Sequence, residues 1–457
     1  MKIFSIDSLP NPVKAEAIVP GSKSYTNRSL LLAALTNKSV KIINPLVSDD
    51  TKVLIDCLKI LGIKVLNGNK SITVEGNISS IKNRSYNLDA NLSGTTIRFI
   101  LALSTIIPGI KTLYGKEGLN KRPIGDLVDG LRQLGAKIEY LDRKGFPPIK
   151  VSSSKLNPGS VRIKASISSQ YVSALLMVTP IIGDVTIEVI GDQVSKPYID
   201  MTIDTMKQFG VRVSNKNYKK YRIEKNQKYD TNKYVVEGDY SSAGYFFAIA
   251  ALTKSTITVK NLSPVSVQAD KKFLGILEKM GNKIIYGKNQ ITVSGLGVKP
   301  VNVDMEGCPD QVQTLAVLAA FANGVTKISG TQSLKVKETD RILATKLELK
   351  KMGISVTSTK TTLTIYGGNP KPASIETYGD HRMAMAFAVA GAKIEGMKII
   401  NPEVVSKTFP DFWDKLNSIG VKTEVITSKN IVLIGMRGSG KSIVAKIISR
   451  KLKKTFF

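Results

Sequence analysis

Leu58-Lys59-Ile60-Leu61-Gly62-Ile63-Lys64-Val65 is the clearest of six similar segments in this chain. In each, a helix-like run ends in an apolar residue and a glycine, and a strand-like run follows directly. Glycine adopts the left-handed conformation that ends many helices, so each glycine predicts a helix C-cap. The other five glycines are Gly135, Gly210, Gly281, Gly353 and Gly420.

These six glycines recur at a spacing of roughly 70 residues, which indicates an internal repeat. A polar turn such as Asn67-Gly68-Asn69-Lys70 follows the glycine and predicts a β-hairpin. Six units of alternating helices and strands predict an α/β fold with mixed sheets. They divide into two groups of three, and we expect the chain to cross between two domains near Tyr234–Ala243.

The composition fits a soluble, multidomain protein. The chain has 457 residues, of which 42% are hydrophobic, and a formal charge of +30. We expect a cytoplasmic protein, because the N-terminal segment lacks the apolar run of a signal peptide and no run is long enough to span a membrane. Two cysteines and one histidine predict neither disulfides nor a metal site.

The positive charge favours an anionic partner, although high lysine usage throughout the chain also explains it as a solvated surface. No block of lysines interleaved with aromatic residues is present, so we expect no nucleic-acid partner. Phosphorylated metabolites remain the favoured class of partner.

One segment of the first half, Pro20–Arg28, places small residues and two cations, Lys23 and Arg28, at the start of a helix-like run. Free amide groups and the helix dipole add to these cations, which predicts an anion site. An ordinary N-cap explains the serines but not both cations. Three further segments place hydroxyl groups or cations before a helix-like run: Ser93–Arg98, Asn120–Ile124 and Ser166–Tyr171.

Four segments of the second half place a carboxylate or a carboxamide near a cation. Surface salt bridges would explain any one of them taken alone. The segments are Pro309–Gln311, Val336–Arg341, Gly379–Ala384 and Ser406–Asp411.

Together, these segments resemble the motifs of the 5-enolpyruvylshikimate-3-phosphate (EPSP) synthase family, in the same order and over nearly all of residues 1 to about 425. The characteristic runs are Pro20–Ser24, Ser168–Gln170, Val336–Arg341, Asp380–Ala384 and Lys407–Asp411. The resemblance implies two domains, each of three βαβαββ units. It places one domain at 12–237 and the other at 1–11 plus 238–425.

The resemblance also implies a reaction. The family transfers the enolpyruvyl group of phosphoenolpyruvate to the 5-hydroxyl of shikimate 3-phosphate through a tetrahedral ketal and releases phosphate, with no cofactor. Asp310 is then expected to act on the hydroxyl and Glu338 on the methylene carbon, with Lys23 sharing proton transfer. His381 is expected to be structural or orienting.

Motif matching also assigns substrate contacts. The expected phosphoenolpyruvate set is Lys23, Gly94, Arg122, Gln170, Arg341, Arg382 and Lys407. The expected shikimate 3-phosphate set is Lys23, Ser24, Arg28, Ser168, Ser169, Gln170, Ser195, Tyr198, Asp310 and Lys337. We expect one chain to act as a monomer on these small molecules.

One departure from the family pattern is Ser333, where many members have asparagine before the Val336–Arg341 motif, and it could alter a contact to shikimate 3-phosphate. The related transferase acting on UDP-N-acetylglucosamine is an alternative. It usually carries a cysteine near the Arg122 region, whereas the cysteines here are Cys57 and Cys308. A non-catalytic protein that binds anions or nucleotides is a second alternative.

The C-terminal segment, 429–457, has a strand-like run, Asn430–Ile434, before the phosphate-loop motif Gly435–Ser442 and a helix-like run. It resembles the start of shikimate kinase. We expect a truncated fusion or remnant without kinase activity, in which Gly440, Lys441 and Ser442 could still contact a nucleotide phosphate. Residues 431–434 could instead pair with residues near Val421–Ile426.

Overall fold

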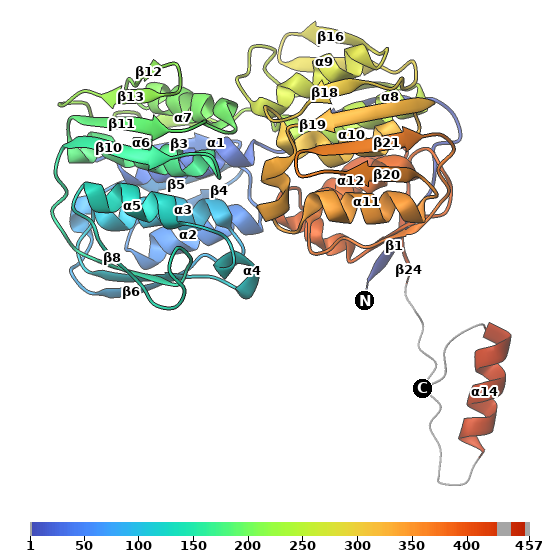
Figure 1. Ribbon diagram of the computed structural model, residues 1–457, viewed down its shortest axis with the longest axis horizontal. Coiled ribbons are helices and arrows are strands. Elements are labelled where there is room, and N and C mark those ends of the chain that lie inside the picture. Colours follow the sequence, from blue (N-terminus) through green and yellow to red (C-terminus); the bar gives the residue numbers. More distant parts are fainter. Residues whose placement is uncertain (1, 427–439, 453–457) are drawn as a thin grey trace.

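A computed structural model describes residues 2–426 and 440–452. Figure 1 shows two lobes side by side, with the first half of the chain mainly in one and the second half mainly in the other. The described residues form six four-stranded sheets, three in each lobe. The expected α/β class is confirmed, and so is the organisation in two groups of three units.

Each sheet of the first lobe has four strands. The first sheet contains β14 (Lys233–Val235), β3 (Ser39–Ile43), β5 (Ser71–Glu75) and β4 (Lys64–Gly68). The second contains β6 (Ser85–Asp89), β7 (Ile110–Tyr114), β9 (Ile149–Ser152) and β8 (Lys137–Tyr140). The third contains β10 (Gly159–Lys164), β11 (Val185–Ile190), β13 (Lys220–Ile223) and β12 (Ser214–Lys216).

The second lobe repeats this plan. Its first sheet contains β2 (Lys14–Ile18), β15 (Thr256–Lys260), β17 (Gln290–Ser294) and β16 (Lys283–Gly287). The next contains β18 (Asn302–Asp304), β19 (Gly324–Ser329), β21 (Thr362–Gly367) and β20 (Ser355–Ser358). The last contains β22 (Ser374–Ile375), β23 (Met397–Ile400), β1 (Ile3–Ile6) and β24 (Thr423–Ile426).

All six sheets share one arrangement. In each, the first two strands as given above are parallel, the third is antiparallel to the second, and the fourth is antiparallel to the third. Three of the units take all four strands from one continuous stretch, and two more take one strand from the crossing strands β2 and β14. The sixth unit is different, because the N-terminal strand β1 takes the hairpin position beside β24. The chain therefore closes its last sheet with its first strand.

Inner helices fill the centre of each lobe and outer helices lie around them. The inner helices are almost wholly buried: α1 (Lys23–Ala34), α3 (Gly94–Thr105) and α6 (Ser169–Ile182) in the first lobe, and α8 (Tyr240–Thr253), α10 (Val312–Ala320) and α12 (His381–Gly391) in the second. The outer helices are α2 (Asp49–Ile60), α5 (Gly125–Gln133), α7 (Lys196–Gln208), α9 (Lys272–Lys279), α11 (Arg341–Lys351) and α13 (Phe412–Ser418). Each lobe thus has its own hydrophobic core.

Short helical elements connect these parts. They are α4 (Glu117–Asn120) and the 3₁₀ turns η1 (Ile78–Ser80), η2 (Ala269–Lys271), η3 (Pro309–Gln311), η4 (Gln332–Val336) and η5 (Pro402–Lys407).

The six repeat glycines each follow an outer helix, as expected. Gly62 has a φ of 98°, and the other five also have positive φ values. The Gly62 amide donates to the carbonyl of Lys59, and the amide of Ile63 donates to the carbonyl of Leu58. This paired hydrogen bonding is the Schellman motif, and the same two bonds recur at all six sites.

The chain crosses between the lobes twice, at 19–22 and at 236–239. The two crossings lie side by side, because the amide of Ser22 donates to the carbonyl of Glu237 (2.8 Å) and the amide of Asp239 donates to that of Pro20 (2.9 Å). The first boundary differs from the expected residue 12, since β2 pairs with β15 of the second lobe. That strand has its hydrogen-bonding partner more than 200 residues away, so motif positions alone did not locate it.

Each crossing is held by an asparagine from one lobe. The Asn44 side-chain amide donates to the carbonyl of Val236 (3.0 Å), and that of Asn261 donates to the carbonyl of Val19 (2.8 Å). A Cβ at Gly21 would lie 2.0 Å from the carbonyl oxygen of Asn44. The crossing therefore needs glycine there, because any side chain would displace the backbone.

The described part of the C-terminal segment is Gly440 and helix α14 (Lys441–Leu452), which Figure 1 shows apart from both lobes. The helix expected after the phosphate loop is confirmed. The expected strand at 430–434, its pairing with 421–426 and most of the loop lie outside the described residues. No helix among the described residues is long and apolar enough to cross a membrane.

Candidate active site

The N-termini of the inner helices carry side chains that meet between the lobes. Lys23 and Ser24 begin α1 and, with Asp310 and Arg382 from the second lobe, line a cavity of about 20 Å³. The Tyr198 hydroxyl of the first lobe donates to Asp310 Oδ2 (3.1 Å). Helix N-termini carry partial positive charge and free amide groups, so this arrangement favours anions.

Five side chains form a chain of alternating charge, here called the charge chain: Arg382, Asp310, Arg341, Glu338 and Lys407. The successive nitrogen-to-oxygen distances are 2.8 Å, 3.0 Å, 2.8 Å and 2.9 Å. Charge-assisted bonds of this length hold both carboxylates in fixed positions. The sequence motifs supply these residues from η3, α11, α12, η5 and, for Glu338, the segment between η4 and α11.

Arg341 is the centre of the charge chain and is only 1% exposed. Its Nε donates to Asp380 Oδ2 (2.7 Å), so one guanidinium contacts three carboxylates. Asp380 in turn caps α12 by accepting from the amide of Arg382 (2.9 Å). The planar fork of arginine suits this geometry, which a lysine ammonium cannot reproduce.

The pKa values of both central carboxyl groups lie below their usual range. Burial alone would raise the pKa of Asp310, but Arg382, Lys337, Arg341 and Lys23 outweigh it. Burial likewise opposes the shift at Glu338, where Lys407, Arg341 and Arg122 lower the pKa well below the usual value. Both groups are therefore ionised at neutral pH.

The cations of the first lobe gather around Gly94. A Cβ at Gly94 would lie 2.8 Å from a guanidinium nitrogen of Arg122 and equally close to one of Arg98. The Gln170 side chain accepts from Arg98 (2.7 Å) and donates to the Thr95 hydroxyl (3.1 Å). A side chain at this position would therefore collide with both guanidinium groups.

Lys23 is paired in this state. Its ammonium lies 3.1 Å from Asp50 Oδ2, at the start of α2. Asp49 beside it accepts from the Ser406 hydroxyl of the second lobe, which is a further contact between the lobes.

The expected shikimate 3-phosphate residues lie mainly at the starts of α1, α6 and α7. Ser168 caps α6 by accepting from the amide of Gln170 (3.2 Å), and Ser195 precedes α7 with a φ of 53°. Arg28 is buried and donates to the Tyr198 carbonyl (2.9 Å) and the Thr202 hydroxyl (2.8 Å). Arg28 therefore ties α1 to α7.

The structure adds residues that the sequence analysis did not assign: Asp50, Arg98, Asp380 and Asp270. Asp270 is 3% exposed, and one of its oxygens accepts from the Ser241 hydroxyl while the other has no partner among the described residues. Burial, reinforced by the charge of Asp310, raises its pKa to about 7. Arg98 and Asp380 stand inside quoted motifs, whereas Asp50 and Asp270 carry no local signal.

His381 is 1% exposed, and its ring nitrogens have no hydrogen-bond partner among the described residues. Burial and the charge of Arg382 lower its pKa well below the usual value. The imidazole is therefore neutral at physiological pH and contributes no charge to the site.

The family model for EPSP synthase (3-phosphoshikimate 1-carboxyvinyltransferase) matches residues 8–416. The chain belongs to the EPSP synthase family. This confirms the resemblance that the sequence motifs indicated. The phosphate-loop motif at 435–442 lies outside the matched range.

Members of the EPSP synthase family are similar over most of the chain. The protein named 3-phosphoshikimate 1-carboxyvinyltransferase of Sulfurovum sp. (strain NBC37-1) is 42% identical over 413 residues, 89% of this chain and 97% of that protein. The protein of the same name from Colwellia psychrerythraea (strain 34H / ATCC BAA-681) is 42% identical over 414 residues, with the same coverage.

The solved EPSP synthase of Acinetobacter baumannii has the same fold, with a TM-score of 0.80 and 24% identity over 93% of this chain and all of that one. The two-domain fold of the EPSP synthase family is thus confirmed for this chain. The residue roles assigned from the family motifs remain predictions.

Proposed function

We propose that this protein transfers the enolpyruvyl group of phosphoenolpyruvate to the 5-hydroxyl of shikimate 3-phosphate and releases phosphate. The observation that carries the proposal is the charge chain, which places two ionisable carboxyl groups among the cations that two anionic substrates require. One chain supplies every residue of this cluster, so the proposal needs no second copy. It requires no cofactor.

The phosphoenolpyruvate carboxylate and phosphate would be held by Arg382, Arg341 and Lys407 of the second lobe, with Lys23 and Arg122 of the first. Arginine pairs with both groups through two parallel hydrogen bonds. The cavity between the lobes is about 20 Å³, which is room for one water. Entry of substrates therefore requires the lobes to separate and then close again.

Shikimate 3-phosphate would lie against the first lobe. Ser168, Ser169 and Ser195 offer hydroxyl groups at helix starts, and Lys337 adds a cation from the second lobe. The other residues assigned from the motifs are Lys23, Ser24, Arg28, Gln170, Tyr198 and Asp310. Arg28 positions the α7 segment that carries Tyr198.

In the addition step, the hydroxyl oxygen attacks C2 of phosphoenolpyruvate and its proton passes to Asp310, while the C3 methylene receives a proton from Glu338. In the elimination step, the resulting methyl group returns a proton to Glu338, the bond between C2 and the phosphate oxygen breaks, and the leaving phosphate takes the proton held by Asp310. Positioned acids and bases of this kind accelerate a step by about 10²–10⁴-fold.

The low pKa that the surrounding cations give Glu338 conflicts with a proton-donating role. Substrate anions resolve this conflict, because they would compensate the charges of Arg341 and Lys407 that hold the pKa down. We infer that substrate binding raises the pKa of Glu338, so that its carboxyl group can hold the proton it donates.

The test is phosphate release from the purified chain supplied with both substrates. We expect release only when phosphoenolpyruvate and shikimate 3-phosphate are present together. Release with UDP-N-acetylglucosamine in place of shikimate 3-phosphate would favour the related transferase. No release with either acceptor would leave only anion binding.

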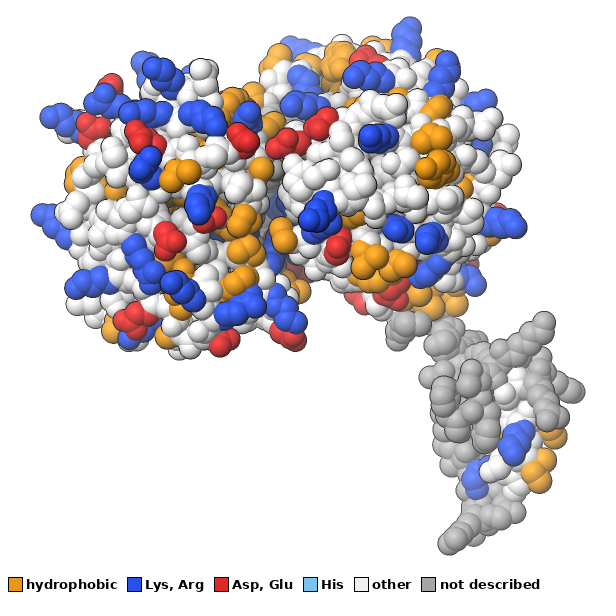
Figure 2. Space-filling view, viewed as in Figure 1, with side chains coloured by type: hydrophobic (Ala, Val, Ile, Leu, Met, Phe, Trp, Pro, Cys, Tyr) orange, Lys and Arg blue, Asp and Glu red, His pale blue; other side chains and the backbone are white. Residues whose placement is uncertain are grey.

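We further place the reaction in the cytoplasm. Both cysteines, Cys57 and Cys308, are buried free thiols, as suits a reducing compartment. Figure 2 shows Lys and Arg spread over both lobes on the visible face, which supports small anions as partners in place of nucleic acid.

A further inference from the structure

The second lobe has a cavity of about 680 Å³ at the end opposite the charge chain. It opens where the inner helices finish: Leu252 and Lys254 end α8, Phe321 caps α10, and Lys393 follows α12. The other ends of these helices carry the active-site residues. The length of α8 alone, 14 residues, separates the two places by about 21 Å.

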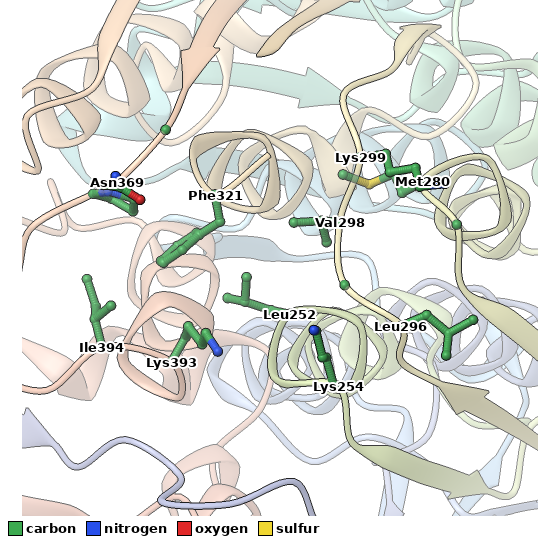
Figure 3. Close-up of a pocket in the computed structure, with 14 residues that line it drawn as sticks. Leu252, Lys254, Met280, Leu296, Val298, Lys299, Phe321, Asn369, Lys393 and Ile394 are labelled. Atoms are coloured by element: carbon green, nitrogen blue, oxygen red, sulfur yellow. The ribbon is translucent and has the colours of Figure 1, made fainter. Parts of the chain in front are cut away.

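Apolar side chains line part of this cavity. Figure 3 shows Phe321, Val298, Leu252 and Ile394 around the hollow, with Leu296 at one side. Leu296 is 67% exposed and lies at the rim of the cavity. The volume lies within the range of pockets that hold small organic ligands.

Every ionisable side chain that lines the cavity is a lysine: Lys254, Lys299 and Lys393. Among the described residues, none of their ammonium groups has an ion pair or a side-chain hydrogen bond. Lys254 also has a φ of 57°, a conformation that costs a lysine about 1 kcal/mol relative to glycine. The cavity therefore combines apolar walls with unneutralised positive charge.

Lysines at helix C-termini can simply complement the helix dipole. Here, however, the terminal carbonyls already have partners. The amide of Ser255 donates to the carbonyl of Ala250 (3.0 Å), and the amide of Gly368 donates to that of Ala320 (3.0 Å). Backbone amides thus satisfy these two terminal carbonyls, and no lysine ammonium group in the described part of the chain bonds to either of them.

We propose that this cavity binds a small organic anion in which one carboxylate or sulfonate is attached to an aromatic body. The aromatic part lies against Phe321, Val298 and Leu252, and the anionic group lies among the three lysines. Phosphoenolpyruvate and shikimate 3-phosphate do not suit this site, because neither has an apolar body.

The test uses 8-anilinonaphthalene-1-sulfonate, whose fluorescence rises in an apolar site, with saturating phosphoenolpyruvate and shikimate 3-phosphate present to occupy the active site. One variant replaces Lys254, Lys299 and Lys393 with glutamine. The matched control replaces three exposed first-lobe lysines, Lys59, Lys82 and Lys207, and so removes the same charge elsewhere.

We expect the cavity variant to weaken the dissociation constant roughly tenfold or more, since three ion pairs are lost. The control should stay within about twofold, and 2-naphthoate should displace the dye from the wild type. Val298→Trp, which fills the cavity and keeps the lysines, should weaken binding too.

Equal affinity in the cavity variant and the control, or absence of dye binding by the wild type, would overturn the proposal. If the triple variant does not fold, Asn369→Glu replaces it, because this exposed residue lines the cavity and a negative charge there should weaken binding. A urea unfolding midpoint like that of the wild type shows that a variant is folded. Because this control does not use the activity, the enzymatic proposal can fail without affecting this outcome, and the reverse also holds.

Discussion

Replacing Arg341 with leucine should destabilise the second lobe by about 3–5 kcal/mol, the usual cost of removing one partner from a buried ion pair. Arg341 is 1% exposed and contacts three carboxylates. After the substitution, Asp310 keeps Arg382 and Glu338 keeps Lys407. Asp380, with a side chain that is 0% exposed, loses its cation altogether, so most of the cost arises there.

Trp413 provides the assay, because it is the only tryptophan in the chain and lies in the second lobe. It packs against Phe4 and Phe412, each with ring centroids 5.0 Å away. Its fluorescence during urea titration therefore reports unfolding of the lobe that contains Arg341.

Two further variants separate the causes. Lys260→Gln removes an exposed pair with Glu16 in the same lobe and should cost less than about 1 kcal/mol. Combining Arg341→Leu with Asp380→Asn keeps the helix cap and removes the stranded charge, so it should restore part of the stability. A cost for Arg341→Leu no larger than that of Lys260→Gln would show that the charge chain does not stabilise the fold.

The other predictions concern substrates and pH. Lys23→Ala and Arg382→Ala should each weaken phosphoenolpyruvate binding by about 2–5 kcal/mol, and Michaelis constants like those of the wild type would exclude these contacts. Asp310→Asn and Glu338→Gln should each lower turnover by about 10²-fold or more in a folded protein, as measured by phosphate release; full activity would remove that residue from the acid–base pair. The stability of Asp270→Asn relative to the wild type should be greater at pH 8 than at pH 5. The folded lobe holds the Asp270 proton up to about pH 7 while the unfolded chain loses it near pH 4, so wild-type stability falls as pH rises through that window. Urea titration at both pH values checks this, and an equal difference at both would contradict it.

The repeat could be predicted from sequence because each glycine is required locally. The left-handed φ at Gly62 and its counterparts excludes most side chains, so the requirement is visible in the residue type itself. The pairing partners of a strand, in contrast, cannot be predicted from its own residues. Nothing in Ile3–Ile6 shows that it pairs with strands near residue 400, since any alternating apolar strand fits that position.

The residue types of the site could be predicted from the sequence, but the contacts between their side chains were less predictable. Asp310, Glu338 and the cations stand in specific motifs, and the structure brings them together. The pairing of Lys23 with Asp50, and the proton held by Asp270, depend on burial created by distant elements. An isolated aspartate has the same appearance in sequence whether it is solvated or enclosed.

The side-by-side crossings have a consequence for synthesis of the chain. The first lobe is a continuous insertion between β2 and α8, so it can fold as soon as residue 238 or so has left the ribosome. At a translation rate of 5–20 residues per second, the partner strands β23 and β24 are made roughly 20–80 s after β1. During that time its hydrogen-bonding edges are open to other chains. The second lobe is therefore the half of the molecule most exposed to misassembly, although its first strands are the earliest to be synthesised.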